Sequence, residues 1–282
     1  MIFHAAAGRG SVRPAPFRLV PLCMGLISLC LLASATAAQT PPLPPMEQFR
    51  LFLLVGQSNM AGRGEVTAAD RVPHPRVLMW SKEGTWVPAV DPMHFDKPVA
   101  GVGLGRTFAA TLAEADPSIT IGLIPAAVGG SPIDAWTPGA FYEPTASHPW
   151  DDAVRRARAA LDAGTLDGIL WHQGESDATA ALAPVYEAKL HDLIARWRAE
   201  LRAPDVPFLA GQLGKFDGHP WDAFRAQIDR AHRALPGTVP RTAFVSADGL
   251  THNGDGVHFD AESYRTLGRR YADAWLALGA AR

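Results

Sequence analysis

A serine stands at a sharp turn directly after a strand-like run of residues. In LFLLVGQSNMAGRG, residues 51–64, the apolar run stops at Gly56 and Ser58 follows two residues later. Such a turn exposes a hydroxyl, and its backbone N–H groups can stabilise an anion. Ser58 is therefore a candidate nucleophile, although strand-end serines also cap helices or bond the backbone. Met60 excludes the G-x-S-x-G elbow of lipases.

A serine nucleophile needs a base, and the base needs an acceptor that fixes its tautomer. The segment GDGVHFD, residues 254–260, offers both groups in one turn, because Asp255 and His258 are three residues apart. The alternative is structural: Asp255 caps the turn, and His258 is a surface residue before the last helix. With Ser58, the segment predicts a Ser–His–Asp set.

A second polar cluster follows the apolar run in GILWHQGESD, residues 168–177. Polar groups at the end of a buried strand must be paired, because an unpaired group costs several kcal/mol. The Gln173 amide is a candidate oxyanion donor. Glu175 competes with Asp255 for His258, or pairs with an arginine such as Arg63.

A glycine pair in AAVGGSPIDAW, residues 126–136, offers backbone donors. An N–H from Gly129 or Gly130, together with the Ser58 N–H and the Gln173 amide, would give three donors to a tetrahedral intermediate. A Gly pair after a strand is also common in turns that need a positive φ. The sequence does not decide which of the two glycines donates.

The elements that must position these groups alternate between apolar runs and helical periodicity, which predicts an α/β sandwich. We expect strands at 50–55, 77–80, 119–125, 168–172, 207–212 and 243–247, and helices at 104–115, 151–163, 183–202, 221–234 and 261–278. Residues 63–103 have little regular pattern and predict a long surface excursion near the site. In such a sheet ligands bind beyond the carboxyl ends of the strands, so the polar turns should share one edge.

The amino-terminal residues have the pattern of a secretory signal peptide. Three arginines precede an apolar run at 19–33, and small residues follow it, so we expect cleavage near Ala37 or Ala38. This predicts a secreted or periplasmic protein, with residues 39–48 as a proline-rich lead-in and 49–282 as one domain. Both cysteines lie in the leader, so the 244 remaining residues contain no disulfide or thiolate metal site.

The charge pattern excludes some partners. The formal net charge of −2 becomes −5 without the three leader arginines, and no basic block remains. Nucleic acid and, after cleavage of the leader, membrane are therefore not expected as partners. The sequence gives no basis for an oligomer.

Four ordered blocks carry a family resemblance: GQSNMAG, AAVGGSPIDAW, WHQGESD and DGVHF. They resemble the SGNH hydrolase superfamily, in particular its branch of sialate O-acetylesterases and family 6 acetylxylan esterases. Glutamine in the third block, followed by a Glu two residues later, is typical of this branch, and PWDAFRAQ, residues 220–227, resembles another of its segments.

The resemblance implies a three-layer α/β/α, flavodoxin-like fold with a mostly parallel five-stranded sheet. It implies an esterase without a cofactor or metal that removes O-acetyl groups from carbohydrates, with Ser58 as nucleophile, His258 as base and Asp255 or Glu175 as the orienting acid. Residues expected to bind substrate are Gln57, Asn59, His172 and Trp136.

Two other functions remain open at this point. A metal-dependent hydrolase could use the imidazole and carboxylate groups of His172, Glu175, Asp177, Asp255 and His258, although no known ligand spacing supports it. A glycan-binding protein could use the aromatic faces of Trp80, Trp86, Trp136 and Trp171, which are as readily core residues.

Overall fold

The alternating strand and helix patterns build one sheet between two helical layers. The computed structural model describes residues 11, 13 and 43–280, so the predicted leader, apart from residues 11 and 13, lies outside the described residues. After one exposed turn of 3₁₀-helix, η1 (Met46–Gln48), the sheet begins at Phe49.

The sheet has seven strands in the order β3-β2-β4-β1-β5-β6-β7. All neighbouring strands are parallel except the antiparallel pair β2 and β3. The α/β class is confirmed, but the count of five strands is wrong. The sheet has more edge strands than expected. One of them, β3, has only three residues and ends at a proline, so it is too short to show a strand pattern in the sequence. The strands are β1 (Phe49–Gly56), β2 (Val77–Trp80), β3 (Trp86–Pro88), β4 (Thr120–Pro125), β5 (Thr165–His172), β6 (Phe208–Gly211) and β7 (Thr242–Val245).

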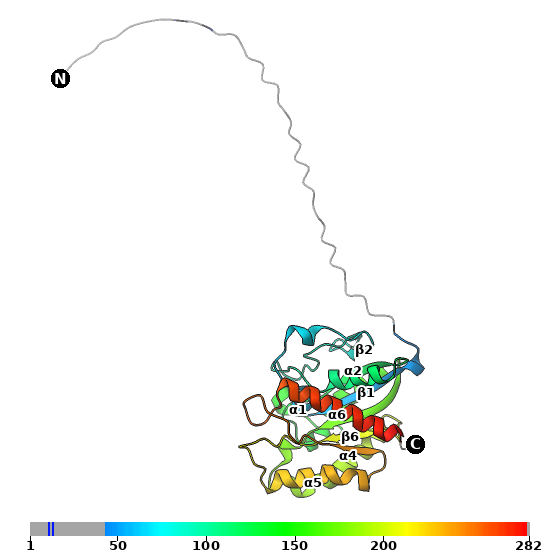
Figure 1. Ribbon diagram of the computed structural model, residues 1–282, viewed down its shortest axis with the longest axis vertical. Helices are drawn as coiled ribbons and strands as arrows, with labels where there is room; N and C mark the ends of the chain where they lie inside the picture. Colours follow the sequence, from blue (N-terminus) through cyan, green and yellow to red (C-terminus); the bar gives the residue numbers. More distant parts are fainter. Residues whose placement is uncertain (1–10, 12, 14–42, 281–282) are drawn as a thin grey trace, which may run out of the picture. The chain divides into compact units, whose positions relative to one another are not determined.

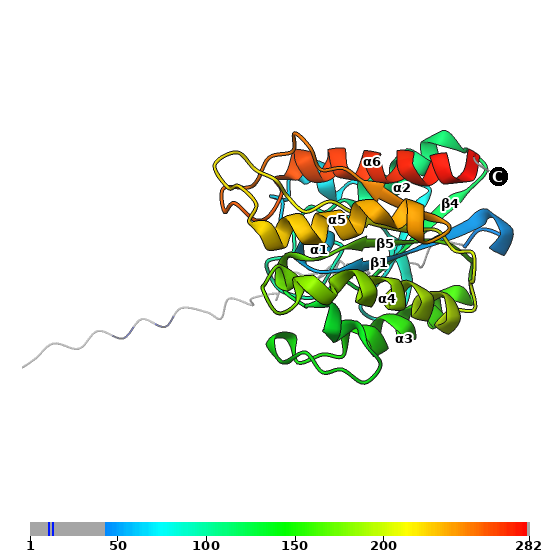
Figure 2. The ribbon, with the colours of Figure 1, turned by 90° about the horizontal axis from the view of Figure 1, so that it is seen from below.

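Helices cover both faces of the sheet. The helices α2 and α6 pack on one face, and α3, α4 and α5 pack on the other (Figure 1). Figure 2 shows β1 and β5 between the pair α2 and α6 and the pair α3 and α4. The α-helices are α1 (Ser58–Ala61), α2 (Gly105–Ala115), α3 (Pro149–Leu161), α4 (Tyr186–Glu200), α5 (Ala223–Thr238) and α6 (Ala261–Ala280). The remaining 3₁₀-helices are η2 (Ala68–Arg71), η3 (Ile133–Trp136), η4 (Glu143–Thr145), η5 (Glu175–Asp177) and η6 (Ala183–Val185).

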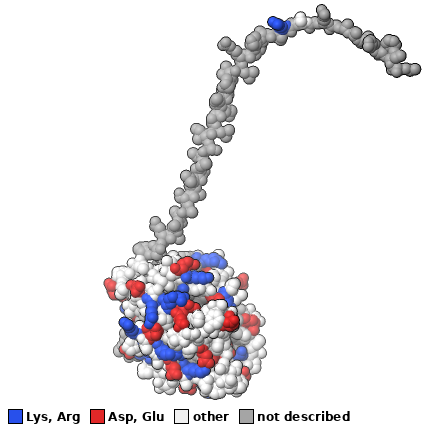
Figure 3. Space-filling view, turned by 180° about the vertical axis from the view of Figure 1, so that it is seen from behind, with Lys and Arg blue, Asp and Glu red and all other residues white. Residues whose placement is uncertain are grey.

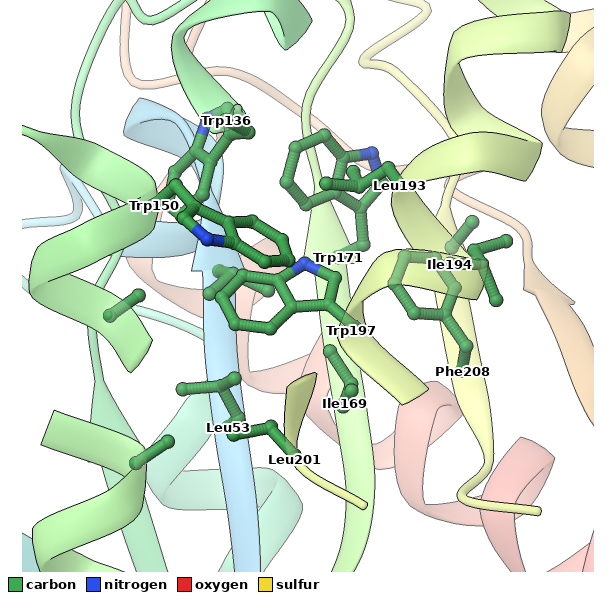
Figure 4. Packing of buried hydrophobic residues seen from close by; sticks show 14 of the residues in the cluster. Leu53, Trp136, Trp150, Ile169, Trp171, Leu193, Ile194, Trp197, Leu201 and Phe208 are labelled. Carbon is green, nitrogen blue, oxygen red and sulfur yellow. The ribbon is translucent and has the colours of Figure 1, made fainter. Parts of the chain in front are cut away.

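Large aromatic side chains fill the core on the α3–α5 face. Trp136 packs edge-on against Trp171 with ring centroids 5.5 Å apart, and the ring centroids of Trp150 and Trp197 lie 4.0 Å apart (Figure 4). Trp86, Trp136 and Trp171 are all buried. Three of the four tryptophans of the glycan-platform alternative therefore serve the core, because each removes a large apolar area from water.

The strand order gathers the polar turns at one edge. β1 lies between β4 and β5: after β1 the chain builds β2, β3 and β4 on one side of it, and it then crosses over to β5 on the other side. Gly56 pairs with His172 and Leu54 with Pro125, so the turns after all three strands start within two residues of one another along the sheet. Such a switch point at the carboxyl ends of parallel strands is where open α/β sheets bind ligands.

The surface carries both signs of charge. On the face in Figure 3, Lys and Arg are interspersed with Asp and Glu and do not form a large patch of one sign. Across residues 43–280, no helix combines the length and apolar character required to span a membrane.

Candidate active site

The Ser58 turn depends on a glycine conformation. Gly56 has φ +128°, and a Cβ there would lie 2.3 Å from the His172 carbonyl oxygen, so only glycine fits. The Gln57 N–H then donates to that carbonyl at 2.9 Å, and α1 begins at Ser58. The sharp turn therefore brings Ser58 to the carboxyl edge of the sheet, where it keeps 7% of its surface exposed.

A preformed loop before α6 presents the imidazole of His258. Asp255 Oδ1 accepts hydrogen bonds from the backbone N–H groups of Val257 and His258, both at 2.8 Å. Asp255 Oδ2 lies 2.6 Å from His258 Nδ1, and His258 Nε2 lies 2.8 Å from Ser58 Oγ. The structure thus joins three side chains, two of them 200 positions apart, in one hydrogen-bonded chain.

The hydrogen bonds from Asp255 through His258 to Ser58 suit His258 to act as a base. Burial would raise the pKa of Asp255, but hydrogen bonds from the backbone and ring of His258 and from the Val257 N–H lower it below its ordinary value. An ionised Asp255 can only accept, so Nδ1 of a neutral His258 carries the proton and Nε2 is left to accept the Ser58 hydroxyl. The arrangement can therefore deprotonate Ser58.

Glu175 contacts neither His258 nor Arg63 by a hydrogen bond. Its Oε1 accepts from Asn59 Nδ2 at 2.5 Å, and its buried Oε2 has no partner among the described residues. Burial raises the pKa of Glu175, and the Asn59 hydrogen bond only partly opposes this. In this geometry Asp255, rather than Glu175, is the carboxylate that holds His258.

Asn59 links the Ser58 turn and the His258 loop from the interior. Its Nδ2 also donates to the Val257 carbonyl at 3.1 Å, and its Oδ1 accepts from the Tyr264 hydroxyl at 2.7 Å. The side chain is fully buried. In this structure Asn59 contacts protein instead of an open site, and it fixes the His258 loop against α1 and Glu175.

The other expected substrate contacts are also buried. His172 is fully buried and shares a 3.2 Å hydrogen bond with the Tyr271 hydroxyl, while Trp136 donates to Ser131 Oγ at 2.9 Å. Gln57 is 3% exposed, and its Oε1 lies 3.4 Å from two backbone N–H groups of the turn after β5. These three side chains lie beneath the surface of the site. Their polar groups bond to protein, because buried polar groups must be paired.

Two backbone groups remain as oxyanion donors. The Gly129 N–H is occupied by Asp96 Oδ2 at 2.8 Å. In contrast, within residues 43–280 neither the Gly130 N–H nor the Ser58 N–H donates a hydrogen bond to protein. Ser58 also stands at the amino end of α1, where the N–H groups point outward. The geometry therefore favours Gly130 over Gly129.

In this structure the Gln173 side chain, expected as an oxyanion donor, bonds to protein. Its Nε2 donates to the Ser131 carbonyl at 3.1 Å and to Asp177, and its Oε1 accepts from the Tyr186 hydroxyl at 2.9 Å. Gln173 is fully buried, so its amide serves this internal network. It supports the loop of Ser131 rather than facing an oxyanion.

The sequence reading missed the role of Asp96. Asp96 Oδ2 accepts from the Gly129 N–H and pairs with Arg63 at 2.9 Å, whereas the sequence analysis pairs Arg63 only with Glu175. Both side chains are nearly buried. The only signal in the sequence is that residues 63–103 include charged residues among Pro, Gly and His. This signal does not identify the partner of Asp96. An antiparallel bridge between Gly64 and Val102 closes this excursion beside the site.

The side chains of the metal alternative do not converge. Asp177 bonds to Gln173 and Ile133, and His172 to Tyr271, whereas Asp255 and His258 bond to each other. In the described part of the chain, no group of three or more His, Cys, Asp or Glu side chains is arranged to hold a metal ion.

Fold and site together define an SGNH-type hydrolase with α/β/α layers. A family model described as carbohydrate esterase, sialic acid-specific acetylesterase, matches residues 48–277, and the chain belongs to this family. Its members are hydrolases that act on ester bonds. A probable carbohydrate esterase from Arabidopsis thaliana is 30% identical over 259 residues, covering 84% of this chain and 92% of the relative.

Solved structures agree with the fold. An X-ray structure of an Arabidopsis thaliana protein has a TM-score of 0.72 at 29% identity, covering 83% of this chain and 99% of that one. NanS has a TM-score of 0.65 at 20% identity, covering 85% and 100%. A carbohydrate acetylesterase from Xanthomonas citri has a TM-score of 0.62 at 22% identity, covering 82% of this chain and 56% of that one. At these identities, the last two show the fold alone.

Proposed function

We propose that this protein is an exported serine esterase that removes O-acetyl groups from carbohydrates through an acetyl-enzyme intermediate. The observation that carries the proposal is the continuous hydrogen-bonded chain from Ser58 Oγ through the His258 ring to Asp255 Oδ2. Membership of the carbohydrate esterase family supports the ester chemistry. The signal-peptide pattern of the sequence supports export.

The first half-reaction forms the acetyl-enzyme. Ser58 Oγ attacks the acetyl carbonyl carbon while His258 Nε2 takes the hydroxyl proton, and Asp255 stabilises the imidazolium that results. The carbonyl oxygen becomes an oxyanion, which the N–H groups of Ser58 and Gly130 are free to bind. The bond to the sugar oxygen then breaks, and His258 returns the proton to that oxygen.

The second half-reaction releases acetate. Water enters where the sugar left, His258 Nε2 takes one of its protons, and the hydroxide adds to the acetyl carbon. The same donors bind the second oxyanion, and its collapse breaks the Ser58 ester while the proton returns to Ser58 Oγ. No step requires a metal or cofactor.

We place acetylated xylan and related saccharides first among the substrates, with acetylated sialic acid as the alternative. The ester bond is common to both, so Ser58 and His258 do not discriminate between them. Lys97 Nζ lies 3.8 Å from where a Cβ on Gly130 would be, which brings one cation near the site. An acidic sugar therefore belongs in any substrate panel.

Acetate release from acetylated xylan, acetylated sialic acid and 4-nitrophenyl acetate, with Ser58→Ala as the control, tests the proposal. We expect turnover by the wild type and a loss of at least about 10³-fold in the variant. Capture of the acetyl-enzyme by mass spectrometry at Ser58 would support the intermediate directly. Undiminished activity of folded Ser58→Ala would refute the mechanism. Comparing the intact and leaderless forms in periplasmic or secreted fractions tests export.

A further inference from the structure

The loop that follows β4 holds the Gly130 N–H between two bonded peptide groups. The Gly129 N–H donates to Asp96 Oδ2 at 2.8 Å, and the Gly130 carbonyl accepts from Ser176 Oγ at 2.8 Å. Within residues 43–280 the Gly130 N–H itself donates to no protein group. An oxyanion donor is effective when its direction is fixed before the charge develops. The bonds on either side of Gly130 therefore determine how well this donor works.

Asp96 is the partner that holds the Gly129 N–H, and Arg63 in turn holds Asp96. Asp96 Oδ2 accepts from Arg63 Nη2 at 2.9 Å as well as from the backbone. The exposed fraction of the side chain is 0% for Asp96 and 7% for Arg63. Asp96 therefore has no surface with which to touch a substrate, and it reaches the reaction only through the Gly129 backbone.

A buried ion pair of this kind is weak evidence for a role in stability. The desolvation of two charges can exceed their attraction, so apolar side chains of similar size often serve a fold equally well. Asp96 Oδ1 is also buried and has no hydrogen-bond partner in the described part of the chain, which makes the burial of this carboxylate less favourable. A pair that contributes little to folding and lies beside an oxyanion donor points to a role in the reaction.

Arg63 also connects this loop to the Ser58 turn. Its Nη1 donates to the Gly62 carbonyl at 2.7 Å, and the Gly62 N–H donates to the Ser58 carbonyl at 2.9 Å, where α1 ends. A Cβ on Gly129 would lie 2.5 Å from Arg63 Nη2, so the guanidinium lies directly against the loop that carries Gly130. One guanidinium thus joins the two segments that supply the oxyanion donors.

We propose that Arg63 and Asp96 are positioning residues of the esterase. Their ion pair fixes the Gly130 N–H relative to the Ser58 N–H, so that both donors face one oxyanion. The inference rests on the proposed function and adds the groups that set its oxyanion stabilisation. Without the pair, the Gly129 N–H is free and the loop can turn, so the Gly130 N–H loses the direction that a tetrahedral intermediate requires.

The expected effect is on kcat rather than on KM. The two N–H groups bond most strongly to the charge that develops in the transition state, and only weakly to the neutral carbonyl of the ground state. Loss of one such donor lowers kcat by about 10²- to 10³-fold, which is the upper limit for a donor that is displaced but still present. A pair that only supported the fold would change the free energy of unfolding and leave the kcat of the folded enzyme unchanged.

The test removes both charges at once. Arg63→Met combined with Asp96→Leu leaves no unpaired charge in the interior, so the protein should keep its fold. Arg50→Met combined with Asp167→Leu is the matched control, because it removes an ion pair of 3.2 Å at the amino ends of β1 and β5, away from the site. Asp96→Asn retains an oxygen that can accept from the Gly129 N–H and serves as the conservative variant. The measurements are kcat and KM for 4-nitrophenyl acetate, the pH dependence of kcat/KM, and thermal unfolding.

We expect kcat to fall by about 30- to 300-fold in the Arg63 and Asp96 double variant with KM within about threefold of the wild type, by less than about tenfold in Asp96→Asn, and not measurably in the control. The pH at which kcat/KM is half-maximal should not move, because Asp255 and His258 keep their hydrogen bonds. Wild-type kcat in the folded double variant, or a loss in Asp96→Asn as large as in the double variant, would overturn the inference.

If the double variant does not fold, Arg63→Lys provides the test. An ammonium keeps a charge beside Asp96, but it lacks the planar fork that bonds Asp96 and the Gly62 carbonyl together. We expect kcat to fall by about three- to tenfold at unchanged thermal stability, and an unchanged kcat would show that the pair does not position the donor. Turnover that survives Ser58→Ala would instead refute the proposed function, whereas failure of this inference alone leaves an esterase that depends on Ser58.

Discussion

Replacing Asp255 by asparagine keeps the size of the side chain but removes the charge that stabilises the His258 imidazolium. Asp255 Oδ2 lies 2.6 Å from His258 Nδ1, and two unit charges about 4 Å apart interact by about 4 kcal/mol at an effective dielectric constant of 20. Because the Asp255 side chain is 43% exposed, solvent weakens this interaction, and about 2–4 kcal/mol is a fair range. We therefore expect kcat/KM to fall by about 30- to 1,000-fold.

The matched control for Asp255→Asn is Glu175→Gln. A glutamine Oε1 can still accept from Asn59, so the His258 loop should stay in place and kcat/KM should fall less than about tenfold. The assay is steady-state hydrolysis of 4-nitrophenyl acetate, with thermal unfolding of both variants to verify folding. A loss in Glu175→Gln equal to that in Asp255→Asn, with unchanged thermal stability, would show that Glu175 serves His258 and that our reading is mistaken.

Three further predictions test the supports of the site. Gly56→Ala should lower the free energy of unfolding by at least about 3 kcal/mol, because φ is +128° and the Cβ would meet the His172 carbonyl; Gly139→Ala, with positive φ but open space around it, should cost only about 1–2 kcal/mol in the same denaturation assay. Asn59→Leu leaves Glu175 and the Tyr264 hydroxyl without their partner, so we expect a loss of about 2–4 kcal/mol in stability and at least tenfold in kcat/KM; native-like values for both would show that Asn59 is not a clamp. Burial lowers the pKa of His232 from 6.5 to about 3, so between these values the unfolded chain binds one more proton and stability falls as pH falls. In urea titrations at pH 6 and pH 4, His232→Gln should therefore lose less stability than the wild type, by about 1.4 kcal/mol per pH unit; equal slopes would mean that His232 is protonated in the folded protein.

The buried aromatic residues show where chemical type alone misleads. Trp136 and His172 resembled sugar contacts in the sequence, yet one packs against Trp171 and the other bonds to Tyr271 in the interior. A sequence lists the groups that a side chain carries, but it does not say on which side of a strand end that side chain lies. Gln173 illustrates the same point, since only the folded structure commits its amide to Ser131 and Asp177.

The sequence by itself determined the α/β class and the main strands and helices, and it singled out Ser58, His258 and two competing carboxylates, Asp255 and Glu175, for the proposed catalytic chain. These follow from local signals: hydrophobic periodicity, glycines at sharp turns, and the three-residue spacing of Asp255 and His258. Only the tertiary structure decided that Asp255 rather than Glu175 contacts the imidazole, and that Asp96 pairs with Arg63 and occupies the Gly129 N–H. The physical reason is that each of these depends on which buried donors and acceptors meet, and residues up to 200 positions apart are brought together only when the sheet and its two helical layers pack.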